Sequence, residues 1–319
     1  MEVLNLILSA LSQGAIYAPM AIGVFIAFRI LNTPDLTIDG SLVFGMTTCA
    51  MITIAGHPIL AIFIGMLAGA GAGLITGLLQ TKLKINPILS GILTMTGLYT
   101  INYMILGGQS NRYLQYETTN SVGVTVAKAS DTIYKMFDRK LEGIFEDSNS
   151  VVLTLTAIIV VIVVVALCLF FKTRSGMAIR ATGDNEEMVR SSSINADTTR
   201  IIGIMVANGL VALSGSLLCH QQRYVDLNNG SGMLVVGLAS VIIGQAFFGK
   251  RGVTIGVISA VFGSALYRII LQIAYKIDMP SYSVKLLSAL IVVVALSLPL
   301  IKEKIMKQKI KKASIGGAI

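Results

Sequence analysis

The chain has 319 residues, of which 54% are apolar and only 13% are charged, and its mean hydropathy is +0.79. A soluble domain of this length cannot hide so much apolar surface behind a charged exterior, so the composition excludes a soluble globular protein. The net charge of +9 does not indicate a nucleic-acid partner either, because the basic residues gather between and beyond apolar blocks.

Nine apolar blocks have about the length that crosses ~30 Å of hydrocarbon as a helix. Backbone groups in lipid must be satisfied within each segment, so we predict an all-α, polytopic helical membrane protein formed as one domain over residues 1–319. The first block is not a signal peptide, because Glu2 and no basic residue precedes it. The predicted spans are 3–28, 38–55, 58–80, 86–107, 151–171, 201–219, 232–248, 253–275 and 283–300.

The basic residues give these spans a direction. If loop 172–200 is cytoplasmic, the short loops on its side and the tail 301–319 hold 16 of the 25 Lys and Arg residues. Positive charge favours the cytoplasmic face, so we expect the N-terminus outside, the C-terminus inside and segment 108–150 outside. The basic tail is expected to lie against anionic lipid.

Glycine marks one span as a packing element. Span 58–80 carries glycines spaced by four, which makes one helix face flat enough for close helix–helix packing: Gly65, Gly69, Gly73 and Gly77. Span 253–275 repeats this pattern more weakly. Segments 38–107 and 232–300 each contain a short helix, a glycine-faced helix and a third helix in opposite orientations, which is the pattern of an inverted repeat. Span 232–248 is short, so it either crosses fully or is broken and partly re-entrant.

Two segments lie outside the spans. In the outer one, apolar residues of Asp131–Ile144 recur at helical spacing, which favours either an amphipathic helix at the membrane rim or a solvated loop with local helix. In the inner one, 172–200, Ser175 can cap a short helix that Gly183 ends in a left-handed conformation. Asp184 with Glu187 then predicts a capping box for a second helix, and Asn195 a cap for the next span.

The inner segment also carries a resemblance to a known family. Residues 176–185 (GMAIRATGDN), together with 193–195 (SIN), 208–215 (NGLVALSG), 34–40 (PDLTIDG), 86–96 (NPILSGILTMT) and 237–244 (GLASVIIG), resemble ABC importer permeases of the branched-chain amino-acid and ribose type. The resemblance is greatest to the branch that imports aromatic amino acids such as tryptophan. It covers most spans but not segment 108–150.

The resemblance implies that 176–190 is a coupling helix seated in a groove of a separate ABC ATPase. The arginines would offer fork donors, the acids acceptors, and the glycines their backbone path. The residues assigned to this role are Gly176, Ala178, Arg180, Ala181, Gly183, Asp184, Asn185, Glu186, Glu187 and Arg190. The resemblance further implies an extracellular substrate-binding lipoprotein, a second permease copy as a homodimer, and a bacterial plasma-membrane location.

Polar residues inside the spans are candidates for the substrate path: Asn208, Ser240, Gln245, Ser90 and Thr94. The two amides are the stronger candidates, because they need partners beyond their own helix. Asp35 and Asp39 are placed at the inner end of the second span, where a carboxylate either caps a helix N-terminus or lines a path, and capping is favoured.

The sequence predicts no catalytic residue, no metal site and no cofactor of its own. The three cysteines and two histidines have no ligand-like spacing. Residues 244–250 (GQAFFGK) nearly match a phosphate-binding loop, but Arg251 replaces the Ser or Thr that binds magnesium, so ATP–Mg is assigned to the partner ATPase. The alternative function is a self-contained secondary transporter. It is disfavoured because almost no ionisable residue stands at a span centre, with Arg268 the main exception.

Overall fold

The computed structural model describes residues 2–119, 125–140, 148–192, 194–249, 252–276, 286–287, 289–294 and 297. Eight helical segments in this part of the chain are long and apolar enough to cross a membrane. The ninth predicted span, 283–300, and the tail 301–319 lie almost wholly outside the described residues.

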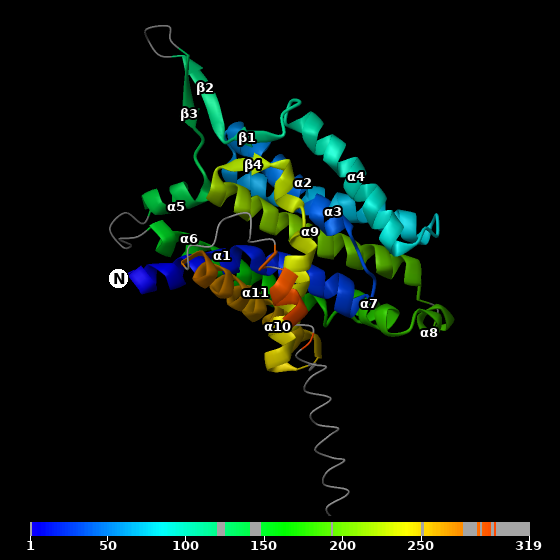
Figure 1. The fold of residues 1–319 in the computed structure, drawn as a ribbon. Helices are drawn as coiled ribbons and strands as arrows, with labels where there is room; N and C mark the ends of the chain where they lie inside the picture. The colour runs from blue at the N-terminus through cyan, green and yellow to red at the C-terminus, as the bar shows by residue number, and fades with distance from the viewer. Residues whose placement is uncertain are drawn as a thin grey trace, which may run out of the picture.

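The eight segments fall where the apolar blocks predict them, and several begin at a Pro or Asn cap. The N-terminal one joins α1 (Glu2–Phe25) to a π-helical turn, and the others contain α2 (Thr37–Ile54), α3 (Pro58–Thr81), α4 (Pro87–Ile105), α6 (Ser148–Phe170), α9 (Ala196–Gln222), α10 (Met233–Phe248) and α11 (Gly252–Lys276). Two shorter helices, α7 (Arg174–Asp184) and α8 (Glu186–Ser191), lie together at one end of the bundle (Figure 1). We call this end the α7–α8 end.

Helix α9 is the centre of the bundle and is almost fully buried by α1, α2 and α3. The four spaced glycines of α3 all lie against it. A Cβ added at Gly69 would come within 2.6 Å of the Asn208 carbonyl oxygen, and one at Gly73 within 2.6 Å of the Ile204 carbonyl oxygen. The absence of side chains on this face therefore lets the two backbones approach closely enough to pack by dispersion.

Helices α1, α10 and α11 form the neighbouring part of the bundle. The Ser264 hydroxyl donates to the Gly14 carbonyl oxygen (2.8 Å), which ties α11 to α1. Nearby, the guanidinium carbon of Arg268 lies 3.6 Å from the centre of the Tyr17 ring. This intramembrane cation thus sits on an aromatic face, which compensates part of its desolvation.

The segment after α4 contains strands as well as the expected helix. Strand β1 (Asn111–Tyr113) pairs antiparallel with β4 (Tyr224–Asp226), and β2 (Gln115–Thr119) with β3 (Thr125–Ala129). Figure 1 shows the β2–β3 hairpin projecting from the bundle away from α7 and α8. We call this the strand end. The amphipathic helix is α5 (Ile133–Lys140), shorter than Asp131–Ile144, and residues 141–144 lie outside the described part.

Candidate functional site

Helices α2 and α10 both begin inside the bundle, beside the middle of α9. Asp35, just before α2, accepts hydrogen bonds from the Thr37 backbone N–H (2.9 Å) and from the Nδ2 group of Asn208 (2.7 Å). Asn208 lies near the midpoint of α9 and is fully buried, as is Asp35. Asp35 therefore caps α2 in the bundle interior instead of at the inner end of a full span.

Asp39 performs the same task for a different helix. Its carboxylate accepts from the backbone N–H groups of Gly232 (3.1 Å) and Leu234 (2.7 Å), which are the first donors of α10. Capping by a carboxylate satisfies orphan N–H groups and matches the positive end of the helix dipole. The predicted capping role thus holds, but Asp39 caps α10 from a residue of α2, and not its own helix.

These positions correct one argument made from the sequence. The second span was expected to keep its carboxylates at the inner membrane surface, leaving span centres almost free of ionisable groups. The structure places Asp35 and Asp39 beside the middle of α9. The low count of central charges therefore does not disfavour ion coupling. Paired short helices that begin near the bundle middle are typical of transporter binding regions.

Three of the five predicted path residues belong to a buried hydrogen-bonded network around α2. The Ser41 hydroxyl donates to Asn208 Oδ1 (2.7 Å), and the hydroxyls of Thr37 and Thr76 lie 2.8 Å apart. Thr76 donates in turn to Thr94 (3.0 Å). Thr94 also donates to the Ser90 carbonyl oxygen. This network joins α2, α3, α4 and α9, so its members hold the helices around the interior.

The other two predicted path residues stand apart from this network. Ser240 donates to the Val236 carbonyl oxygen of its own helix (2.9 Å). Gln245 lines a hollow of about 320 Å³ at the α7–α8 end, together with Arg29, Arg180 and Asp184. The structure thus divides the five residues among three places, and their path role stays a prediction.

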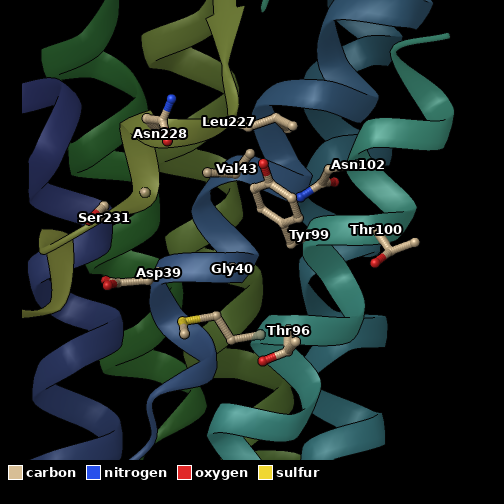
Figure 2. A pocket seen from close by; sticks show the side chains of 12 residues that line it. Asp39, Gly40, Val43, Thr96, Tyr99, Thr100, Asn102, Leu227, Asn228 and Ser231 are labelled. Atoms are coloured by element: carbon tan, nitrogen blue, oxygen red, sulfur yellow. The ribbon is translucent and has the colours of Figure 1, made fainter. Parts of the chain in front are cut away.

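A cavity of about 370 Å³ opens between the start of α2, the outer half of α4 and the 3-10 turn Leu227–Gly230 (η2). Figure 2 shows Asp39 and Ser231 on one side of it and Tyr99 and Asn102 on the other. The sequence analysis did not select Tyr99 or Asn102. A signal was present, because Thr96, Tyr99 and Asn102 recur every third residue in an otherwise apolar span, which places polar groups on one helix face.

Helix α7 begins and ends differently from the sequence prediction. Its cap is Thr173, whose hydroxyl accepts from the Gly176 N–H (3.3 Å), and not Ser175. Gly183 is helical and does not end α7; it lies against the Ile30 carbonyl group, where a side chain would overlap backbone. The glycine thus serves close packing in place of a left-handed turn.

Helix α8 corrects the second capping prediction. Asn185, in extended backbone conformation, accepts from the Met188 N–H (3.0 Å) and caps α8. Asp184 instead closes α7, so the capping box with Glu187 does not form. The prediction for Asn195 is confirmed, because its side chain accepts from the N–H groups of Asp197 and Thr198 at the start of α9.

Ion pairs fasten α8 to α9. Arg190 pairs with Glu186 and with Asp197, and Arg200 pairs with the second oxygen of Glu186. The two carboxylates hold the pKa of Arg190 above its usual value, Glu186 having the larger effect. Within α7, the Thr182 hydroxyl lies 2.7 Å from that of Thr199 on α9. The two short helices are therefore held firmly against the bundle.

The residues assigned to coupling divide into two groups in this setting. Gly176 and Gly183 contact the bundle, Ala178 and Ala181 are half-buried, and Glu186 and Arg190 serve the ion-pair network. The remaining side chains form an exposed face, which we call the outer face of α7–α8: Met177, Arg180, Asp184, Glu187 and Met188. Within the described residues its three charged members form no ion pair with each other or with the bundle.

Comparison with known proteins places this arrangement in a family. The profile described as branched-chain amino acid transport system/permease component matches residues 6–296. A tyrosine transport system permease protein of Clostridioides difficile is 33% identical, over 91% of this chain and 90% of its own. An autoinducer 2 import system permease protein of Yersinia enterocolitica is 24% identical over 85% of this chain and 68% of its own.

A probable branched-chain amino acid transport permease protein of Methanocaldococcus jannaschii is 23% identical over 70% of this chain and 69% of its own. No solved structure matches the chain significantly. The profile covers nearly all the described helices, including the paired short helices α2 and α10 and the α7–α8 projection. The chain is therefore a multi-pass membrane protein that belongs to the branched-chain amino acid transport system permease family.

Proposed function

We propose that this chain is the transmembrane subunit of an ATP-driven importer that moves an aromatic amino acid across a bacterial plasma membrane. The tyrosine transport permease among its relatives supports the substrate class. The outer face of α7–α8 is the observation that carries the proposal. A projection fastened by ion pairs and glycine contacts, yet presenting unpaired charges and exposed methionines, is suited to docking a protein partner.

The partner on this face is an ABC ATPase that binds and hydrolyses ATP–Mg. Arg180 can bind a carboxylate of the ATPase through two parallel hydrogen bonds, and Met177 and Met188, each about half exposed, supply adaptable apolar contact. Closure of the ATPase would move α7, and Gly183 would pass that movement to the end of the first membrane helix. The α7–α8 end is then cytoplasmic, and the strand end with the N-terminus faces outside.

Two further partners complete the assembly. An external binding lipoprotein would deliver substrate at the strand end, where β1–β4 and the β2–β3 hairpin project. A second permease copy would cover the lipid-side faces of α3 and α4, whose exposed apolar residues include Phe63, Leu67 and Met104. The substrate path then lies beside the paired short helices α2 and α10.

The docking role can be tested by reversing one charge. Arg180→Glu is expected to reduce both co-purification of the ATPase and ATP-driven uptake of tyrosine by proteoliposomes at least tenfold, because a carboxylate would then face the acidic groove. Lys128→Glu is the matched control, since Lys128 is exposed on β3 at the strand end; it should leave both measurements unchanged. Normal assembly and uptake with Arg180→Glu would refute the docking assignment.

A self-contained secondary transporter is the alternative function, and one observation favours it. Asp35 and Asp39 lie beside the middle of α9, where ion-coupling carboxylates of such transporters are found. Both carboxylates, however, already accept two hydrogen bonds from groups that need them: α10 donors for Asp39, and Thr37 and Asn208 for Asp35. Their structural role is thus satisfied without a bound cation.

A further inference from the structure

The cavity between α2, α4 and η2 has the size and lining of a small-molecule site. Its volume of about 370 Å³ lies within the range of roughly 300–1,000 Å³ that such sites occupy. Val43, Met95 and Leu227 give it apolar walls, and Tyr99 adds an aromatic ring that is 54% exposed. A ring-bearing ligand would replace water on these surfaces.

One polar atom in this lining lacks a partner. Asn102 is only 2% exposed, and its Oδ1 atom accepts no hydrogen bond from any described residue. A buried carbonyl without a donor costs about 1–3 kcal/mol, and such groups in native proteins are usually explained by a ligand or water. Figure 2 shows the Asn102 amide beside the Tyr99 ring, on the side of the cavity opposite Asp39.

The opposite side carries a negative charge. The Asp39 carboxylate lines the cavity, and its two backbone hydrogen bonds leave a lone pair free on each oxygen. Ser231 adds a hydroxyl there. Among the described residues that line the cavity, none is basic. The site therefore suits a ligand with a cationic group at one end and a hydrogen-bond donor at the far end of a ring.

We propose that this cavity is a substrate subsite that selects aromatic amino acids carrying a ring donor. The α-ammonium group binds on the Asp39 side, the ring packs against Tyr99, and Asn102 Oδ1 accepts the phenol O–H of tyrosine or the indole N–H of tryptophan. This inference rests on the proposed function, because it assumes that an amino acid passes through the chain. Phenylalanine fits the same space but leaves Asn102 unpartnered, so it should bind more weakly.

The composition of the chain provides a direct binding assay. The protein contains no tryptophan, so emission from bound L-tryptophan can be excited selectively over its tyrosines. The full chain in lipid nanodiscs, without the binding lipoprotein, is titrated with L-tryptophan, and the bound tryptophan is then displaced with L-tyrosine or L-phenylalanine. The expected result is that tyrosine displaces it at about tenfold lower concentration than phenylalanine, the effect of one net hydrogen bond.

Two variants assign the effect to residues. Asn102→Leu keeps a similar volume without the acceptor, so tyrosine and phenylalanine should displace tryptophan equally. Asp39→Asn keeps an N-cap for α10 but removes the charge, so both competitors should weaken by the same factor. Equal displacement by the two amino acids in the wild-type chain, or no tryptophan binding at all, would overturn the inference even if Asn102→Leu failed to fold.

ATP-driven uptake by the same preparation, reconstituted with its ATPase, separates this inference from the proposed function. If uptake proceeds while wild-type binding shows no preference for tyrosine, the subsite is wrong and the importer assignment stands. If no ATP-driven uptake of any aromatic amino acid occurs, the proposed function fails as well.

Discussion

A methyl group added at Gly183 tests whether α7 is fixed against the end of the first membrane helix. The Cβ of Gly183→Ala would overlap the Ile30 carbonyl oxygen and lie 2.8 Å from its carbon and 2.9 Å from the Leu31 Cα. Ordinary contact begins at 3.4 Å, so α7 must retreat by roughly 0.6 Å or more. The obstructing atoms belong to the backbone, which no rotamer change can move aside.

The expected cost follows from two opposing terms. Overpacking of this kind costs about 1–3 kcal/mol, whereas replacing a helical glycine by alanine gains about 1 kcal/mol. The net expectation is a loss of about 1 kcal/mol, with a larger loss of coupling because α7 is displaced from its docking position. Gly71→Ala in α3 is the matched control, since an added Cβ there has no neighbour within 4 Å. That variant should gain the alanine term alone.

The assay uses the buried thiols of the chain. Cys49 and Cys219 are buried, so a thiol-reactive dye reports their exposure during heating in nanodiscs. Gly183→Ala should lower the melting temperature and reduce ATP-driven uptake, whereas Gly71→Ala should raise the melting temperature and keep uptake. If Gly183→Ala raised the melting temperature as the control does and kept full uptake, the packing argument would be refuted.

Two more predictions concern the bundle interior, and both use the same melting assay. Asn208→Leu leaves the buried Asp35 carboxylate without its Nδ2 donor and should cost about 3 kcal/mol; an unchanged melting temperature would show that Asp35 does not need this partner. Gly69→Ala should destabilise because its Cβ would overlap that of Ala212, and Ala212→Gly should restore part of the loss in the double variant. Strictly additive effects would show that the two helices do not meet at this point.

The sequence predicts the spans well because their signal is local. A block of about 20 apolar residues needs no partner to be recognised, and eight of the predicted spans coincide with helices of the structure to within a few residues. The glycine face of α3 was likewise visible as a four-residue repeat. What the repeat does not contain is the identity of the opposing helix, α9, which lies far along the chain.

The capping errors at α7 have a physical reason. Glycine serves both to end helices and to permit close approach, and the sequence around Gly183 fits either use. The contact with Ile30 decides between them, and that contact exists only in the folded bundle. Thr173 and Ser175 are both competent caps, and the chain begins α7 at the earlier of the two.

The candidate site was harder to predict because its residues come from distant segments. Asp39 caps α10 although 193 positions separate it from Gly232, and no pattern near Asp39 indicates that partner. The strands after α4 did carry a local signal, since residues 115–129 are rich in Thr and Val. That signal was missed because the segment was considered only for helical periodicity.

The central claim, that the chain moves its substrate only when driven by a separate ATPase, is tested most directly by reconstituted uptake. Proteoliposomes containing the chain, with or without its ATPase, are given external tyrosine and binding lipoprotein, and either internal ATP or an imposed sodium or proton gradient. We predict uptake with ATPase and ATP together, and none from either gradient when the ATPase is left out. Uptake driven by a gradient in liposomes that contain this chain alone would contradict the account.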